Sequence, residues 1–175
     1  MKYLSLLLLL CFSLSTEAQN DSIQFPQHYY GVYKGDLNII NSKGTQTIGM
    51  EFHLQPTDSI GKYKYTIVYI MNGKRQQRNY NLITKDANKG EYIVDENNGI
   101  LLDAKQVDNT LYSMFEVQNN LITTTERFYK DAMDFEIMFT NIKQKKLSKT
   151  EEGEETIDVI SYPIGGIQKA HLIKQ

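Results

Sequence analysis

The sequence predicts an all-β protein, folded as an antiparallel up-and-down barrel of about 8–10 strands. Apolar and polar residues alternate along short runs, which is the pattern of strands with one buried face. Turn-forming Asn, Asp, Gly and Pro residues separate these runs at a spacing of about 8–12 residues, and no run has the period of an amphipathic helix. Connections this short favour hairpins, and closing a barrel removes the unpaired edge strands. A sandwich of two sheets is the alternative architecture.

The first 18 residues have the form of a secretory signal peptide. One lysine precedes an apolar run over residues 4–14, and small and polar residues follow it. We therefore expect cleavage after Ala18 and a secreted or periplasmic protein. The run is too short to span a bilayer, so we expect no membrane span. A lipid anchor on Cys11 is disfavoured, because Leu10 stands where a small residue would precede a lipidated cysteine.

Residues 19–175 are expected to form a single β-barrel domain that is long enough to bury a core. This part of the chain contains no cysteine, which excludes disulfides and thiol chemistry within it. The net charge of the chain is −2, and its basic and acidic residues are interleaved. We therefore expect neither nucleic acid nor an anionic membrane as a partner.

The first predicted strand, residues 28–40, carries Gly31 and Gly35 on the same face as Tyr33. Glycine inside a strand loses packing and marks a bend or the close approach of another backbone. We expect the two glycines to let this strand coil sharply at the start of the barrel. Room for a ligand beneath the glycines is the alternative.

Further strands are expected over residues 45–55, 63–71, 78–84, 91–94, 100–103, 111–118, 121–129, 133–142 and 157–173. The Asn72-Gly73 pair between two of them is a strong hairpin signal. Residues 143–155 are charged and lack an apolar pattern, so we expect a loop there. The residues expected in the core are Tyr33, Phe52, Tyr65, Ile67, Leu82, Phe115 and Phe135.

The run Gly31-Val32-Tyr33 in the first strand resembles the start of the lipocalin/calycin superfamily of secreted β-barrels. In that superfamily the aromatic residue is usually Trp, and it closes one end of the barrel beneath a basic residue from a late strand. The resemblance implies that Tyr33 takes the Trp position and that Lys169 or Arg127 supplies the base. The sequence contains no Trp and no further lipocalin motif, so the resemblance concerns the fold alone.

The sequence contains no motif for catalysis or metal binding, so we expect a protein that is not an enzyme and has no cofactor. His28, His53 and His171 lack further ligands at the spacing of a metal site. No Gly-x-Ser-x-Gly nucleophile elbow and no phosphate-binding glycine loop occur. The alternative is His171 as an axial haem ligand, since haem-binding barrels of the nitrobindin type resemble this layout in using a late-strand histidine.

The chain contains 12 tyrosines, of which Tyr65 and Tyr69 share one face of a predicted strand. Tyr combines an apolar ring with a hydroxyl that seeks a partner, which suits a pocket for a small, partly apolar ligand. We therefore predict a secreted, lipocalin-like binding protein whose ligand enters the mouth of the barrel. The predicted ligand-binding residues are Tyr33, Tyr65, Tyr69, Arg127 and His171. The alternative is an interaction or structural module of the cell envelope, with a filled barrel and no small ligand.

Overall fold

The computed structural model of the chain describes residues 24–152 and 155–175. The predicted signal peptide over residues 1–18, with Cys11, lies outside the described residues. The described part of the chain forms twelve strands and three short 3₁₀ helices. In this part, no helix is long and apolar enough to cross a membrane.

The strands are β1 (Gly31–Asn41), β2 (Gly44–Pro56), β3 (Lys62–Met71), β4 (Lys74–Asp86), β5 (Glu91–Asp95), β6 (Leu101–Val107), β7 (Thr110–Val117), β8 (Asn120–Phe128), β9 (Ala132–Asn141), β10 (Lys146–Glu152), β11 (Glu155–Ser161) and β12 (Gly166–Lys174). The 3₁₀ helices are η1 (Gln27–Tyr29), η2 (Ala87–Lys89) and η3 (Ile142–Gln144).

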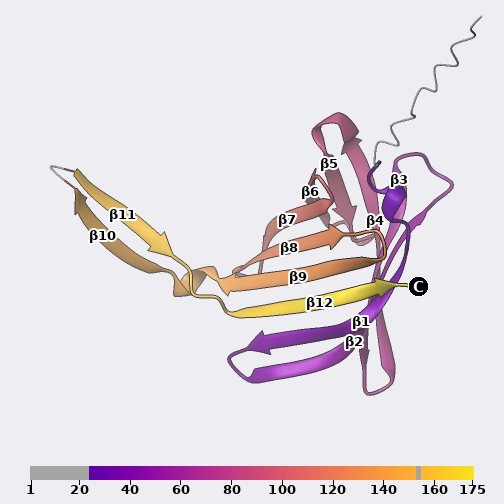
Figure 1. Cartoon of the computed structure of the whole chain (residues 1–175). Helices are drawn as coiled ribbons and strands as arrows, with labels where there is room; N and C mark the ends of the chain where they lie inside the picture. Colours follow the sequence, from indigo (N-terminus) through magenta and orange to yellow (C-terminus); the bar gives the residue numbers. More distant parts are fainter. Residues whose placement is uncertain (1–23, 153–154) are drawn as a thin grey trace, which may run out of the picture.

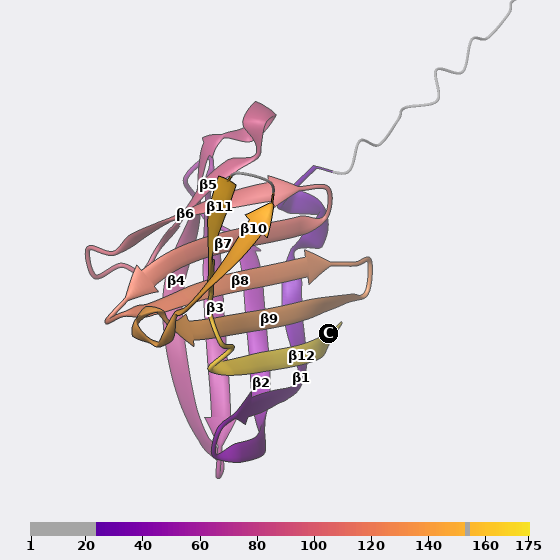
Figure 2. The same ribbon diagram turned by 90° about the vertical axis from the view of Figure 1, so that its left-hand side faces the viewer.

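Ten of the strands close into one antiparallel barrel (Figure 1, Figure 2). Its strand order is β1-β12-β9-β8-β7-β6-β5-β4-β3-β2, and β2 pairs with β1 to complete the ring. Consecutive strands pair as hairpins from β1 to β9, and β12 closes the ring by pairing with both β1 and β9. The predicted all-β antiparallel barrel is therefore confirmed, and the two-sheet sandwich is excluded.

Tight turns join several of these strands. Asn72 and Gly73, between β3 and β4, have positive φ angles of 51° and 73°. Positive φ at both central positions is what the primed turns of two-residue hairpins require, so the predicted hairpin is confirmed. Gln118 and Asn119, between β7 and β8, have φ angles of 49° and 65° and form a similar turn without glycine.

Side chains at alternate positions of the strands fill the interior of the barrel. Six of the seven residues expected in the core are buried, and the seventh, Phe115, is half-buried. A side chain on the outer face of the barrel is buried as well. Val68 points outward from β3 and is nevertheless fully buried. Glu51 lies beside Val68 in the register, and its carboxylate accepts hydrogen bonds from Arg75 Nη1 at 2.9 Å and Nη2 at 2.7 Å.

Aromatic rings close the end of the barrel next to η1, and we call this group the aromatic plug. Its centre is Phe128, whose ring centroid lies 5.7 Å from that of Phe25, 5.4 Å from that of Tyr29 and 6.1 Å from that of Tyr33. The hydroxyl of Tyr33 donates a 2.5 Å hydrogen bond to the carbonyl oxygen of Tyr29, which ties β1 to η1. We call the pairing of β1 with β12, which closes the barrel, its seam. The plug therefore joins the segment before the barrel to β1 on one side of the seam and to β8 on the other.

The basic residue above Tyr33 is Lys174, at the end of β12, with Nζ 5.9 Å from the ring centroid. The prediction from the resemblance that Lys169 or Arg127 takes this role is wrong. Lys169 instead forms an ion pair with Glu136 at 2.8 Å, and Arg127 lies on the outer face of β8. A base from the last strand does cover Tyr33, as the resemblance implies, but it is a different lysine.

Gly35 allows β1 and β12 to approach closely at the seam of the barrel. A Cβ atom at this position would lie 2.6 Å from the carbonyl oxygen of His171 and 3.1 Å from Cδ2 of Leu172. At Gly31, the three atoms nearest to a Cβ atom would all belong to the side chain of Lys174, which can move away. The space that the two glycines leave is thus taken by β12 and not by a ligand cavity.

We expect Gly35→Ala to lower the free energy of unfolding by about 1–3 kcal/mol, because the backbone of β12 must shift to admit the methyl group. Gly31→Ala is the matched control, and its loss is expected to stay under about 1 kcal/mol. Urea denaturation of both variants measures the difference. Equal losses would show that the close approach at Gly35 does not determine how the seam closes.

The strands β10 and β11 form a separate two-stranded ribbon, which projects from the barrel between β9 and β12 (Figure 1). The prediction of a loop over residues 143–155 is therefore wrong, because this stretch contains β10 and most of η3. The predicted strand over residues 157–173 is in fact two strands, since β11 ends at Ser161 in the ribbon and β12 begins at Gly166 in the barrel. The described side chains of the ribbon are exposed, including Leu147 and Ile160. The sequence of β10 has no alternation of apolar and polar residues, which is the pattern that predicts a strand, because neither of its faces is buried.

Candidate ligand-binding cavity

A cavity of about 120 Å³ lies inside the barrel. A cavity only slightly larger than this holds a benzene molecule in another protein, so the space suits a very small ligand. The lining residues come from β3 to β9 and are Tyr65, Ile67, Tyr69, Tyr80, Val94, Glu96, Leu102, Ser113, Phe115, Thr124, Glu126, Phe135 and Ile137.

Glu126 is the most unusual residue of this lining. It lies on β8 with only 1% of its surface exposed. The hydroxyl of Tyr65, from β3, donates a 2.8 Å hydrogen bond to Oε1 of Glu126. The other carboxylate oxygen, Oε2, is buried and has no hydrogen-bond partner among the described residues. A buried acceptor without a partner costs free energy, so this oxygen is a candidate for ligand binding.

Burial raises the pKa of Glu126 to about 7, because the ionised carboxylate is disfavoured away from water. The hydroxyl of Tyr65, and after it that of Thr124 and the backbone, act in the opposite direction and do not outweigh burial. Burial, and then the charge of Glu126, raise the pKa of Tyr65 well above its ordinary value. Burial also raises the pKa of Tyr69 to about 12. The carboxyl group of Glu126 thus changes its protonation state near neutral pH, whereas the hydroxyls of Tyr65 and Tyr69 stay protonated there.

Aromatic rings and a second acidic residue complete the chemistry of the cavity. The ring of Tyr65 stacks on that of Tyr80 with a centroid distance of 6.4 Å and packs edge-on against that of Phe52 at 4.8 Å. Burial, and then the charge of Glu96, raise the pKa of Tyr80. Among the described residues that line the cavity, none is Lys, Arg or His. The cavity is therefore aromatic and acidic.

The wall of the barrel is weakest beside the cavity, between β6 and β7. These two strands share only four residue pairs, and none of them includes Leu102 or Phe115. Both of these side chains line the cavity. Leu101 and Met114, which precede them on the same strands, are exposed. The stretch of wall between Leu102 and Phe115 therefore has no backbone pair across it, and exposed apolar side chains flank it.

The structure separates the five residues that were predicted to bind a ligand. Tyr65 and Tyr69 line the cavity, whereas Tyr33 is buried in the aromatic plug. Arg127 and His171 lie on the outer wall, where both line a surface depression. The polar contact that sequence reasoning assigned to Arg127 or His171 is therefore not available to a ligand in the interior.

The two-residue period of the strands explains why Arg127 and His171 face outward and why Glu126, which was not predicted from the sequence, faces the interior. Phe128 and Leu172 are fully buried, so their neighbours Arg127 and His171 must face outward. The same period puts Glu126, two positions before Phe128, on the inner face of β8. The acidic Glu126, two positions before the aromatic Phe128 on the same strand, was therefore the feature of the sequence that could have predicted the site.

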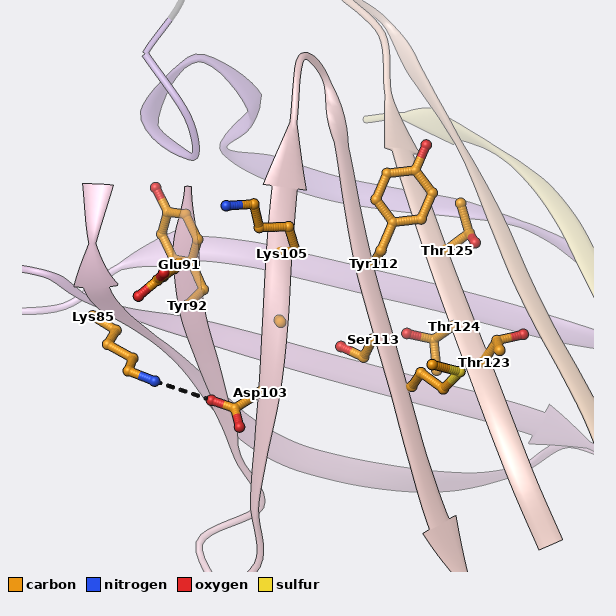
Figure 3. A pocket seen from close by; sticks show the side chains of 12 residues that line it. Lys85, Glu91, Tyr92, Asp103, Lys105, Tyr112, Ser113, Thr123, Thr124 and Thr125 are labelled. Carbon is orange, nitrogen blue, oxygen red and sulfur yellow. Dashed lines mark hydrogen bonds and ion pairs between the residues drawn. The ribbon is translucent and has the colours of Figure 1, made fainter. Parts of the chain in front are cut away.

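A larger depression, of about 530 Å³, crosses the barrel wall over β4 to β8 (Figure 3). Two of its charged side chains form an ion pair, with Lys85 Nζ 3.4 Å from Asp103 Oδ1. Both side chains are more than half exposed to solvent, at 53% and 86%. A solvated ion pair of this kind needs no ligand. The buried and unpartnered carboxylate makes the smaller interior cavity the stronger candidate.

The three histidines all lie outside the cavity. His53 Nε2 lies 2.9 Å from Glu51 Oε2, and His171 Nδ1 lies 2.7 Å from Asp134 Oδ1, both on the outer wall. His28, in η1, is exposed. Haem bound through His171 would thus stand outside the barrel. Over residues 24–152 and 155–175, no three His, Cys, Asp or Glu side chains gather in the arrangement of a metal site.

Comparison of the chain with protein families, with curated proteins and with solved structures finds no match. The interpretation of the cavity therefore depends on its geometry and its chemistry.

Proposed function

We propose that this protein binds a small, partly apolar ligand in the interior of its barrel. The observation that carries the proposal is the cavity around Tyr65 and Glu126, whose lining is mainly aromatic and apolar with a few polar groups. Small-molecule binding sites commonly have this composition. The proposed arrangement is lipocalin-like: Tyr33, beneath Lys174, closes one end of the barrel, and the ligand lies further inside the barrel.

In this proposal the protein acts after export, in a secreted or periplasmic form from which residues 1–18 have been removed. The apolar run over residues 4–14 and the small and polar residues that follow it support export. The ligand is held without covalent chemistry, and the proposal includes no catalytic role and no cofactor.

A thermal-shift screen of fatty acids, haem and small aromatic compounds tests the proposal. We expect at least one small aromatic compound to stabilise the protein by about 2.7 kcal/mol at a concentration of 100 times its Kd. For a domain of this size, that corresponds to a rise in Tm of roughly 5–10 °C. The stabilisation arises because the ligand binds only the folded barrel.

Two tyrosine variants connect such a shift to the cavity. Tyr69→Ala removes a ring from the lining and is expected to weaken binding about tenfold or more. Tyr112→Ala is the matched control, because Tyr112 is exposed on the outer wall and does not line the cavity. A screen in which no compound shifts the Tm, or a hit weakened equally by both variants, would contradict the proposal.

One observation favours the alternative, an interaction or structural module of the cell envelope. The ribbon of β10 and β11 projects from the barrel and exposes apolar side chains, including Leu147, Val159 and Ile160 (Figure 1). Exposed apolar side chains that gather on one element are typical of an interaction site. In this alternative the barrel is a scaffold without a small ligand, and the absence of any hit in the screen would favour it.

A further inference from the structure

We propose that the cavity selects a small primary amine, bound as its ammonium ion against Glu126, with its apolar part among the tyrosine rings. This inference rests on the proposed function and specifies the class of ligand. Three features of the cavity support it: the free carboxylate oxygen, the aromatic and acidic lining, and the volume.

The free carboxylate oxygen determines which polar group the ligand carries. Tyr65 already donates to Oε1 of Glu126, and Oε2 is left without a donor. An ammonium group supplies both N–H donors and a positive charge that compensates a buried carboxylate. A neutral donor such as an alcohol would satisfy the hydrogen bond and leave the charge uncompensated. A carboxylate ligand would place a second negative charge beside the first.

The rest of the lining favours a cation in the same way. Tyr65, Tyr69 and Tyr80 bring three aromatic rings to the cavity, and the face of a tyrosine ring attracts a cation. Glu96 adds a second acidic group to the lining. Arg78, whose charge lowers the pKa of Tyr69, is exposed and is not one of the lining residues. The polar groups that line the cavity are therefore acidic or hydroxylic, and the rest of the lining is aromatic or aliphatic.

The volume of about 120 Å³ limits the apolar part of the ligand to about one ring or a short branched chain. Benzylamine carries a single ring and is protonated at neutral pH. Benzyl alcohol and benzoate have the same ring with a neutral and an anionic group in place of the ammonium. The three compounds thus separate the contribution of charge from that of ring burial.

Isothermal titration calorimetry of these three compounds at pH 8 tests the inference. We expect benzylamine to bind at least about tenfold more tightly than benzyl alcohol, and benzoate to bind most weakly. Glu126→Gln is expected to reduce the affinity for benzylamine to that for benzyl alcohol, because the amide carries no charge. Glu116→Gln is the matched control, since Glu116 is exposed on β7 and outside the lining, and it is expected to keep the preference.

The pH dependence of the unaltered protein gives a second test, which holds even if the Glu126→Gln variant fails to fold. Lowering the pH from 8 to 5 places a proton on Glu126, whose pKa is about 7. The affinity for benzylamine is therefore expected to fall by a factor on the order of ten to a hundred. The affinity for benzyl alcohol is expected to change far less. Glu96→Gln, measured over the same range, separates the contribution of the second acidic group.

The possible outcomes distinguish this inference from the proposed function. If benzyl alcohol or another small uncharged compound binds in the cavity and benzylamine binds no more tightly than its alcohol, the amine inference is overturned and the proposed function stands. An amine preference that survives in Glu126→Gln also overturns the inference. If neither these compounds nor any member of the thermal-shift screen binds, both are overturned.

Discussion

Phe128→Ala is expected to lower the free energy of unfolding by about 3–5 kcal/mol. Phe128 is fully buried at the centre of the aromatic plug. Its ring packs against the rings of Phe25, Tyr29, Tyr33 and Phe52. Truncation removes this aromatic contact and leaves a void among side chains whose backbones belong to different elements, so the void closes only in part. Urea denaturation followed by circular dichroism measures the loss.

Phe115→Ala is the matched control for this prediction. Phe115 is half-buried and lines the cavity beside the weak β6–β7 pairing, so its truncation removes less packed surface. We expect a loss of about 1–2 kcal/mol. If Phe128→Ala costs no more than Phe115→Ala, the aromatic plug does not make the main contribution to stability that its packing implies.

Glu126→Gln is expected to change how stability depends on pH between about pH 4.5 and 8. Burial raises the pKa of Glu126 from 4.5 to about 7 in the folded protein, so the folded state holds this proton more tightly than the unfolded chain does. The stability that Glu126 contributes is therefore fully present below about pH 4.5 and is lost as the pH rises to about 7. A difference of this size in pKa corresponds to about 3 kcal/mol.

The difference in unfolding free energy between the variant and the unaltered protein is therefore expected to shift by about 3 kcal/mol in favour of the variant from pH 4.5 to 8. Hydrogen bonds from Arg75 lower the pKa of Glu51 to about 2, so the stability from Glu51 is lost only as the pH falls from about 4.5 to 2. Measurements above pH 4.5 thus isolate Glu126. The exposed Glu116→Gln control is expected to follow the unaltered protein, and an equal shift in that control would contradict the assignment to Glu126.

The fold class was predictable because burial in a barrel imposes the same two-residue pattern on nearly every strand. Tyr33, Phe52 and Phe135 stand in clear alternation and are all buried. The strand β10 was not predictable in this way, whereas most of β11 fell within the predicted strand over residues 157–173. Lys149 of β10 and Asp158 of β11 pair across the ribbon at 3.2 Å and are 58% and 57% exposed. The strand β10 is thus defined by backbone pairing that leaves no hydrophobic pattern in its sequence.

The site was predictable only in part. Tyr65 and Tyr69 were found because they share an apolar face of β3, and both line the cavity. Glu126 was missed because the inner face of β8 is polar at Thr124 and Glu126, and only the buried ring of Phe128 reveals which way it points. The Tyr65–Glu126 contact joins residues 61 positions apart in the chain, a separation over which no local pattern carries information.

A crystal structure of the protein with saturating benzylamine tests most directly whether the interior of the barrel is the ligand site. We expect the compound inside the cavity, with its nitrogen within hydrogen-bond distance of Glu126 Oε2 and its ring beside Tyr65 and Tyr69. An interior that holds only side chains and water, with the compound absent or bound in the outer depression near Lys85 and Asp103, would contradict this assignment.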